Sequence, residues 1–177
     1  FAVLTKRVLI GTYEPGQHPI WGSYYLRHWL VQRAAQFIPW RLIAGTELQC
    51  VVLRLLGARI GENVHIHKGV QCTHGGWDLL TIGDNVTLGR DAAIRIVDFE
   101  SQTMFMGPVV IGDNVTLETR AGVSSYVTLE ANSYVTALSH VESGVTVPAG
   151  IRWHGIPGSA DGVAPEVVAI TREETTW

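Results

Sequence analysis

A ladder of aliphatic residues at every sixth position constrains this chain more than any other feature of its sequence. The ladder has seven consecutive rungs: Ile111, Leu117, Val123, Leu129, Val135, Val141 and Val147. Four residues after each rung stands a smaller or β-branched residue: Val115, Ala121, Val127, Ser133, Ser139, Val145 and Ile151. A period of six is typical of chains in which each hexapeptide forms a short strand and a corner, and three hexapeptides complete a triangular coil. Because one coil cannot bury its own apolar rungs, the pattern predicts a stack of coils, a parallel β-helix.

Three copies of Ile-Gly-(Glu/Asp)-Asn-Val begin at Ile60, Ile82 and Ile111 and mark equivalent corners of successive coils. Glycine relieves crowding at such a corner, and Asp-Asn tolerates the dihedral angles of a turn. The copies are 82 − 60 = 22 and 111 − 82 = 29 residues apart, whereas a coil of three hexapeptides needs about 18 residues. Two loops are therefore expected, near residues 72–81 and 96–108. Loops on a rigid scaffold are where functional residues concentrate.

Residues 1–59 have the period of helices instead. One predicted helix has apolar residues at Leu26, Trp29, Leu30, Ala34, Phe37 and Ile38. A second begins at the capping box Thr46-x-x-Gln49 and ends at Gly57. Its predicted inward residues are Leu48, Val51, Val52, Leu55 and Leu56. We expect these helices to cap the first coil and shield its strand edges.

Contact with a membrane interface is the alternative for this segment, because aromatic residues alternate there with arginines. The residues concerned are Trp21, Tyr24, Tyr25, Trp29 and Trp40 with Arg27, Arg33 and Arg41. The predicted organisation is a helical cap over 1–59, a β-helix over 60–158 and a polar C-terminal tail over 159–177. The fold class is thus mainly β, a left-handed parallel β-helix with an N-terminal helical appendage.

Charge and composition exclude several classes of protein. The 13 Lys and Arg against 16 Asp and Glu give a net charge of −3 without a basic run, so no nucleic-acid partner is expected. Charged residues interrupt the long apolar stretches, which argues against a membrane-spanning helix. Cys50 and Cys72 form no Cys-x-x-Cys pair, which argues against disulfides or a thiolate zinc site and indicates a reducing compartment. The start at Phe1, without signal-peptide features, indicates a segment excised from a longer protein.

Several stretches resemble a known family. The run WHGIPGSA at 153–160 resembles the exit signature of hexapeptide acyltransferases. Longer stretches are EPGQHPIWGSYYLRHWLVQR at 14–33, LRLLGARIG at 53–61, GGWDLLTIGDNVTL at 75–88 and GPVVIGDNVTLETRAGV at 107–123. Together they resemble the C-terminal acetyltransferase-like domains of ε-poly-L-lysine-synthetase-type nonribosomal peptide synthetases.

The resemblance implies a role in amide bond formation within a larger membrane protein, at the cytoplasmic face of a bacterial membrane. The implied donor is an aminoacyl thioester on the phosphopantetheine of a carrier domain, with no cofactor bound directly to this domain. The implied partners are the carrier domain, sister β-helix domains arranged as a pseudo-trimer, and a cationic amino acid or oligomer. Membrane proximity follows from the transmembrane helices that separate such domains in the family.

The second loop departs from the family pattern. Related domains often read Thr-His-x-Phe-Glu-Asp there, whereas Ile96-Val97-Asp98-Phe99-Glu100-Ser101 places Val97 where the histidine would stand. Acyl transfer to an amine needs a group that accepts the amine's proton. Asp98 and Glu100 are candidate catalytic carboxylates if they are buried. Alternatively, they attract a cationic substrate together with the corner residues Asp84 and Asp113, or Asp98 merely pairs with Arg95 or Arg120.

His140 is the third candidate catalytic residue, at an outward position where a partner domain can meet it; the alternative is an ordinary surface histidine. His74, Trp77 and Asp78 are candidate substrate-binding residues, because Gly75-Gly76 permits close approach of a ligand to the backbone. The alternative for the first loop is a corner packed by Trp77.

Trp153 and His154 follow the last coil, where the resemblance implies a pantetheine arm lying along the solenoid. They are candidate substrate-binding residues, and the alternative is that Trp153 covers the open end of the core. His65-x-His67 lacks a third ligand, so no metal site is expected. Cys72 has neither a helix N-terminus nor a base beside it in the sequence, so an activated thiol is not expected.

Three functions remain in view. The first is an acyltransferase-like domain that takes part in peptide-forming synthesis. The second is a non-catalytic scaffold that has lost its histidine and completes an assembly of sister domains. The third, a free-standing acetyl-CoA transferase, is disfavoured because the second loop has no histidine.

Overall fold

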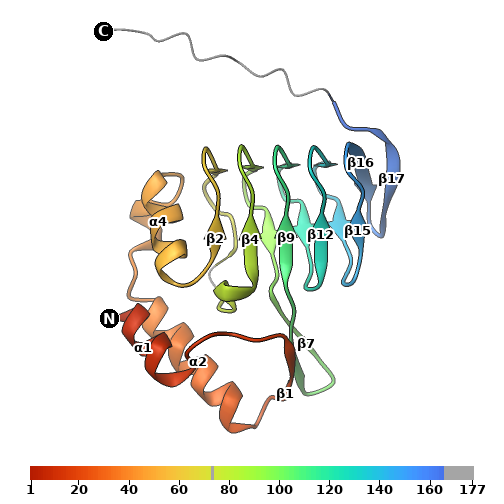
Figure 1. Cartoon of the computed structure of the whole chain (residues 1–177). Coiled ribbons are helices and arrows are strands. Elements are labelled where there is room, and N and C mark those ends of the chain that lie inside the picture. Colours follow the sequence, from red (N-terminus) through yellow and green to blue (C-terminus); the bar gives the residue numbers. More distant parts are fainter. Residues whose placement is uncertain (73, 166–177) are drawn as a thin grey trace, which may run out of the picture.

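The β-helix predicted from the six-residue ladder is the body of the molecule (Figure 1). The computed structural model describes residues 1–72 and 74–165. The first face of the left-handed coil contains, in spatial order, β2 (Arg59–Ile60), β4 (Leu80–Ile82), β9 (Val109–Ile111), β12 (Val127–Leu129) and β15 (Thr146–Val147). The second contains β3 (His65–Ile66), β5 (Thr87–Leu88), β10 (Thr116–Leu117), β13 (Tyr134–Val135) and β16 (Ile151–Gly155). The third contains β6 (Ala93–Ile94), β11 (Gly122–Val123) and β14 (His140–Val141).

The ladder residues point inward, as predicted. All seven rungs from Ile111 to Val147 are at most 1% exposed. On the first face, Ile60, Ile82 and Ile111 stand in register, so the three copies of the corner motif begin successive coils. Their asparagines, Asn63 and Asn85 among them, have φ angles of 54° and 56°. Asparagine tolerates this left-handed conformation better than most residues, which explains its recurrence at the corner.

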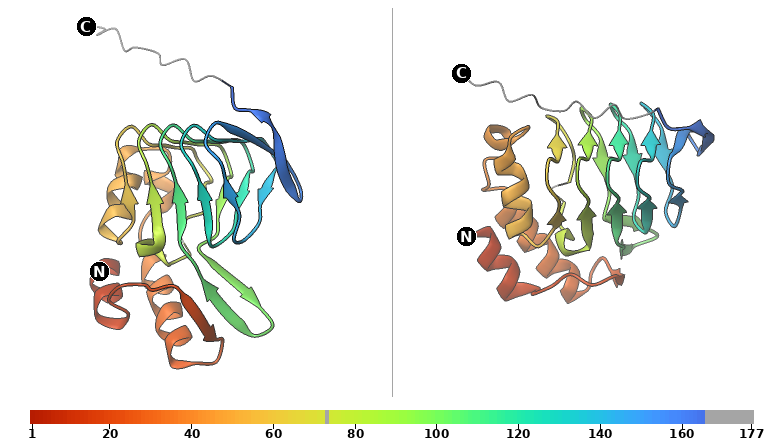
Figure 2. Two further views of the ribbon diagram at one scale, coloured as in Figure 1. Left: turned by 45° about the vertical axis from the view of Figure 1, so that its right-hand side comes forward. Right: turned by 45° about the horizontal axis from the view of Figure 1, so that its top comes forward.

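A helical cap covers the first coil at one end of the β-helix (Figures 1 and 2). Its helices are α1 (Ala2–Leu9), α2 (Ser23–Ala35), α3 (Trp40–Ile43) and α4 (Glu47–Leu55). Helix α4 starts after Thr46 as predicted, but no capping box forms: Thr46 Oγ1 donates to the Ile43 carbonyl, and Gln49 Oε1 accepts from the Gly45 N–H. The helices lie beyond β2, whereas strand β1 (Gly16–Pro19), in the same N-terminal segment, lies outside the cap.

The predicted inward face of α4 is wrong for three of its five residues, whereas Leu56 is buried and Val52 is half-buried against the core. Leu48, Val51 and Leu55 are 60%, 44% and 58% exposed. The buried face consists of Gln49, Cys50, Leu53 and the following Leu56. Apolar residues occupy both sides of this helix, so its sequence is compatible with either side facing the core. In the structure the side with Cys50 faces the first coil, where the thiol contacts the Val64 carbonyl.

Both predicted insertions protrude from the coil. The first carries a short 3₁₀ helix, η1 (Trp77–Leu79). The second is a β-hairpin of β7 (Val97–Glu100) and β8 (Thr103–Met106), and the N-terminal strand β1 (Gly16–Pro19) pairs with β8 in antiparallel fashion. The N-terminal segment therefore reaches along the solenoid from the cap to the hairpin (Figure 2).

The C-terminal boundary differs from the prediction. Strand β17 (Gly158–Val163) folds back in antiparallel fashion on β16, so the polar tail expected from residue 159 begins as a strand. Residues 166–177 of that tail lie outside the described residues. Within residues 1–72 and 74–165, no helix is long and apolar enough to cross a bilayer.

Candidate functional site

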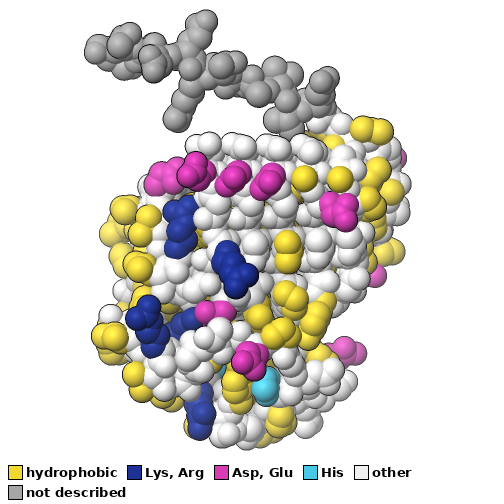
Figure 3. Space-filling view, viewed as in Figure 1, with side chains coloured by type: hydrophobic (Ala, Val, Ile, Leu, Met, Phe, Trp, Pro, Cys, Tyr) yellow, Lys and Arg dark blue, Asp and Glu magenta, His cyan; other side chains and the backbone are white. Residues whose placement is uncertain are grey.

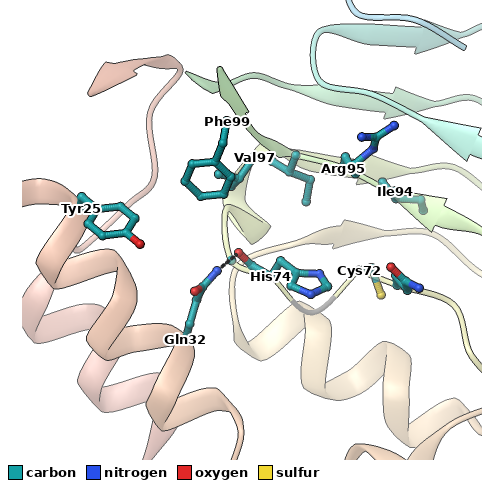
Figure 4. A pocket seen from close by; sticks show the side chains of 11 residues that line it. Tyr25, Gln32, Cys72, His74, Ile94, Arg95, Val97 and Phe99 are labelled. Atoms are coloured by element: carbon teal, nitrogen blue, oxygen red, sulfur yellow. Dashed lines mark hydrogen bonds between the residues drawn. The ribbon is translucent and has the colours of Figure 1, made fainter. Parts of the chain in front are cut away.

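A pocket of about 380 Å³ lies where the cap, the first insertion and the base of the hairpin meet (Figure 4). Its lining consists of Tyr25, Gln32, Gln71, Cys72, His74, Gly75, Ile94, Arg95, Ile96, Val97 and Phe99. The wall is mainly apolar. Its ionisable side chains are those of His74, Arg95, Tyr25 and Cys72. An apolar pocket with a few polar groups is the usual form of a small-molecule site.

Helix α2 fixes the first insertion against the hairpin. Gln32 Nε2 donates to the His74 carbonyl over 2.6 Å, and the rings of Tyr25 and Phe99 meet edge to face with centroids 6.3 Å apart. Figure 4 shows the exposed His74 ring at the pocket, on the side opposite the strand that carries Val97. Side chains at 74 and 97 thus border the same space, although 23 residues separate them in the sequence.

The other two candidate residues of the first insertion, Trp77 and Asp78, stabilise the fold. Trp77 is fully buried, and its Nε1 donates to the Cys72 carbonyl over 3.0 Å. Asp78 forms an ion pair with Lys6 at 2.6 Å and accepts from the Tyr13 N–H at 2.9 Å. Because Trp77 is enclosed by the core and Asp78 by α1, the expectation that they contact substrate is corrected, and the alternative of a packed corner describes them.

Gly75 explains why the insertion lies so close to α2. It has a φ angle of 90°, and a Cβ there would lie 2.5 Å from the His28 ring. His28 is fully buried and shares a 3.1 Å hydrogen bond between its Nδ1 and the Tyr13 hydroxyl. Burial lowers the pKa of His28 to about 4, with the nearby His18 and His74 as smaller causes. His28 is therefore a neutral support behind the pocket.

Arg95 joins this pocket to a polar cluster on the third face of the solenoid. Its guanidinium lies 3.2 Å from His140 Nε2, which is also 3.0 Å from Ser124 Oγ. Because arginine only donates, His140 Nε2 is the acceptor in the first contact. Burial, and then the charge of Arg95, lower the pKa of His140. His140 points outward as predicted, since it is half-buried while the next residue on β14, Val141, is buried in the core. Its neighbour on β11 is Gly122, whose lack of a side chain leaves room for the imidazole.

Asp98 is held by the same cluster. It accepts from the Ser125 hydroxyl at 2.7 Å and from the Ser125 N–H at 3.2 Å, and it lies 4.0 Å from Arg95. Its pairing with Arg95 was one of the alternatives drawn from the sequence. Arg120 instead faces Asp91 at 4.0 Å.

A second, acidic groove of about 440 Å³ borders the other side of the hairpin. It is lined by Asp98, Phe99, Glu100, Phe105, Ser124, Ser125, Tyr126 and Ser143. Asp98 and Glu100 therefore do share one groove, but the expectation that Asp84 and Asp113 join them is wrong. Strand β9 runs from the hairpin to the corner that carries Asp113, and the acidic row visible at the upper edge in Figure 3 lies at the opposite end from the hairpin.

The remaining sequence candidates lie apart from the pocket or are engaged. His65 and His67 have ring centroids 5.8 Å apart, and in the described part of the chain no group of three His, Cys, Asp or Glu side chains converges on a metal position. Cys72 borders the pocket, but burial raises the pKa of its thiol to about 12. A thiol of such a pKa is a poor nucleophile at neutral pH.

Trp153 and His154 stand on β16 at the C-terminal end. Trp153 is half-buried under β17, and its Nε1 lies 3.4 Å from the His140 carbonyl, as expected for a residue that covers the end of the core. His154 shares a 2.9 Å hydrogen bond with Thr136. Neither belongs to the pocket beside the hairpin, and a binding role along the solenoid stays a prediction.

Sequence reasoning missed Tyr25, Gln32, Arg95 and Ser124 as site residues. Arg95 and Ser124 each follow an inward residue on adjacent strands of the third face, Ile94 and Val123. The six-residue register therefore contained a signal for Arg95 and Ser124, since equivalent corner positions stack in neighbouring coils. No such signal existed for Tyr25 or Gln32, which reach the pocket only through packing of α2.

Comparison with known proteins places the chain beside one large synthetase and several acetyltransferases. It is 33% identical over 167 residues to delta-poly-L-ornithine synthetase of Acinetobacter baumannii (strain AB307-0294), an alignment that covers 91% of this chain and 12% of that protein. The chain thus spans about an eighth of the length of this relative. No family model matches.

Solved structures of similar shape share the solenoid. A maltose O-acetyltransferase from Clostridium difficile 630 matches with a TM-score of 0.61 and 18% identity, over 92% of this chain and 97% of that one. A hexapeptide-repeat acetyltransferase from Vibrio cholerae, complexed with acetyl coenzyme A, matches with a TM-score of 0.51 and 18% identity, over 68% and 78% of the two chains. The chain therefore has the hexapeptide-repeat fold of these acetyltransferases.

Proposed function

We propose that this domain takes part in amide bond formation within a poly-amino-acid synthetase, and that the pocket beside the hairpin is where the acyl group is transferred. The observation that carries the proposal is the pocket lined by His74 and Arg95, in a chain that aligns over 91% of its length with delta-poly-L-ornithine synthetase. The donor would be an aminoacyl thioester on a carrier domain, and the acceptor the amine of an amino acid or oligomer.

His74 has the place that a general base requires. Attack of an amine on a thioester carbonyl forms the C–N bond and breaks the C–S bond, and the nitrogen loses one proton, which a base accepts and the departing thiolate finally takes up. In the domains that this chain resembles, a histidine often stands at the position of Val97. Since the side chains at 74 and 97 border one pocket, an imidazole on the first insertion reaches the same space as an imidazole on the hairpin. In this chain the base is then His74.

Arg95 supplies positive charge where negative charge develops on the carbonyl oxygen. Arg95 lines the pocket, and its guanidinium contacts His140 at 3.2 Å and lies 4.0 Å from Asp98. A fixed donor aimed at the oxyanion costs no reorganisation during the reaction, which is the basis of electrostatic catalysis. His140 therefore acts as a positioning residue for Arg95.

Strand alternation argues against Asp98 and Glu100 as bases. Successive side chains on β7 point to opposite faces, so Asp98 and Glu100 share the face opposite to Val97. Both line the acidic groove, and neither lines the pocket with His74. We assign them to recognition of a cationic amino acid or oligomer, through an attraction that weakens as salt rises.

The larger assembly follows from the length of the relative. Because the chain aligns with 12% of delta-poly-L-ornithine synthetase, most of a protein of that kind lies elsewhere. We propose that a carrier domain delivers the donor, and that sister β-helices pack against the flat faces of the solenoid as a pseudo-trimer. Such packing would enclose the acidic groove beside the hairpin.

The test compares variants within the intact synthetase. His74→Ala is expected to lower kcat about 10²- to 10⁴-fold, the usual contribution of a general base. His65→Ala is the matched control, because both histidines are exposed and only His74 borders the pocket. Adding Val97→His to the His74→Ala variant is expected to restore part of the rate. An unchanged rate in His74→Ala would contradict the assignment.

A non-catalytic scaffold is the second candidate, favoured by the specific replacement of the family histidine by Val97. In that case His74→Ala and Arg95→Gln leave the rate of the intact synthetase unchanged, whereas changes on the packing faces lower it. Asp98→Asn with Glu100→Gln tests recognition separately. A raised KM for a cationic substrate with an unchanged thermal midpoint supports substrate recognition by the acidic groove. An unchanged KM contradicts that role.

A further inference from the structure

The helical cap exposes an unusual amount of apolar side chain for a surface. Ten aliphatic or aromatic residues of the cap are at least 44% exposed. Besides Trp21 and Leu26, they are the following eight: Phe1, Leu4, Val8, Phe37, Leu42, Leu48, Val51 and Leu55. We call these eight residues the cap surface. Single exposed apolar residues are ordinary, whereas a cluster of them marks a contact site.

The cap surface points away from the β-helix. Helix α1 buries Ala2 and Lys6 toward the body, so the stripe of Phe1, Leu4 and Val8 occupies the opposite side. Helix α4 repeats this geometry, since Leu53 and its buried neighbours face the first coil and the Leu48, Val51 and Leu55 stripe faces outward. A spacing of three and four residues places each stripe on one side of its helix.

The two stripes belong to the same end of the molecule. Figure 1 places α1 and α4 beyond β2, and the rings of Phe1 and Phe37 meet edge to face at 6.0 Å. Figure 3 shows hydrophobic side chains along this end, with Lys and Arg among them.

Charge divides the chain at the same boundary. Residues 1–59 contain seven Lys and Arg and two Asp and Glu, a net charge of +5; residues 60–177 contain six and fourteen, a net charge of −8. These add to the total of −3. Arg7 on α1 and Arg41 on α3 are exposed, and Arg54 on α4 is exposed while it donates to the Ile60 and Gly61 carbonyls. Exposed apolar stripes flanked by arginine are the composition of helices that lie in a membrane interface.

We propose that the cap surface docks on an anionic lipid bilayer. Leu, Val and Phe would enter the acyl boundary while the arginines contact lipid phosphates, and the negative β-helix would stand away from the negative surface. A second copy of the chain is a poorer occupant of this surface, because it would bring one cap of charge +5 against another. The proposal does not depend on the reaction assigned to the pocket.

The test measures sedimentation of the 177-residue chain with vesicles. Vesicles of phosphatidylglycerol and phosphatidylcholine are expected to bind the chain at low salt, with weaker binding at high salt and on phosphatidylcholine alone. Leu4→Ser with Val8→Ser is expected to lower binding about tenfold or more, because two buried aliphatic contacts are lost. Leu138→Ser with Ile156→Ser is the control, since both residues are exposed apolar side chains far along the solenoid.

A second variant removes charge without removing apolar contact. Arg7→Gln with Arg41→Gln is expected to weaken binding to anionic vesicles and to reduce its salt dependence, whereas Arg120→Gln leaves both unchanged. All changed positions are exposed, and circular dichroism verifies that each variant folds. Absence of vesicle binding, or equal losses in cap and control variants, overturns the proposal. If the parent chain binds no vesicles but self-associates, and the cap variants abolish that self-association, the cap surface binds a second copy of the chain instead.

Discussion

The buried ion pair between Lys6 and Asp78 predicts that the first insertion depends on α1 for its stability. The side chains are 6% and 14% exposed, with Nζ 2.6 Å from one carboxylate oxygen. The same oxygen accepts from the Tyr13 N–H at 2.9 Å. Removing one partner leaves the other charge buried, which costs about 3–5 kcal/mol. Asp78→Ala should therefore remove a large part of the folding free energy, which is about 5–15 kcal/mol for a domain.

Urea unfolding, followed by circular dichroism, measures this loss. Replacing both partners, Lys6→Met with Asp78→Asn, should cost less than Asp78→Ala alone, because no charge is stranded and an asparagine still accepts from the Tyr13 N–H. Asp78→Glu is a milder control that keeps the charge. A free energy unchanged in Asp78→Ala, or a double variant as costly as the sum of its single changes, would refute the structural role. A raised KM for the substrate in Asp78→Ala, with an unchanged free energy of unfolding, would indicate that Asp78 binds substrate.

Three further predictions concern the core, pH and the polar cluster. Val123→Asp places an unpaired charge at a fully buried rung and should abolish cooperative thermal unfolding; a midpoint near that of the parent chain would contradict the ladder. His28 has a pKa of about 4 when folded and 6.5 as a free side chain, so the unfolded chain binds the proton first and stability falls as pH drops from 6.5 to 4, by about 3 kcal/mol. This loss of stability is complete below pH 4 and should be smaller in the His28→Gln variant. Some loss remains in that variant, because the pKa of His140 is lowered as well. Equal dependence of the unfolding free energy on pH in the parent chain and in the variant would contradict the prediction. Gly122→Ala should push the imidazole of His140 away from Ser124 and Arg95, raising its pKa toward 6.5 in an NMR titration; an unmoved pKa would exclude this coupling.

The solenoid was predictable because a single constraint repeats at every coil. Each rung, such as Leu129, faces the same interior, so seven weak preferences agree on one register. The spacing of Ile60, Ile82 and Ile111 likewise located both insertions, because extra residues in a coil of fixed length must leave it. Repetition also explains why His140 could be placed outward from sequence alone.

The cap and the pocket walls were less predictable because they depend on distant contacts. Lys6 and Asp78 are 72 residues apart in sequence, and nothing near either residue indicates the other. Strand β1 contains glycine and proline, which are poor strand formers, and it forms because β8 offers a free edge. The phase of α4 was misjudged for the same reason: its apolar residues fit two faces, and contact with the first coil selects one.

Strand β7 separates the side chains of the candidate site onto two faces. Alternation along the strand turns Val97 toward the pocket with His74 and turns Asp98 and Glu100 toward the acidic groove, with Phe99 bordering both spaces. A change at position 97 therefore alters the pocket with His74 without disturbing the carboxylates beside it. Because the opposite wall of that pocket carries His74, an imidazole borders the same space although valine stands at position 97. The sequence departure at Val97 is thus compatible with catalysis once the two insertions are seen to face each other.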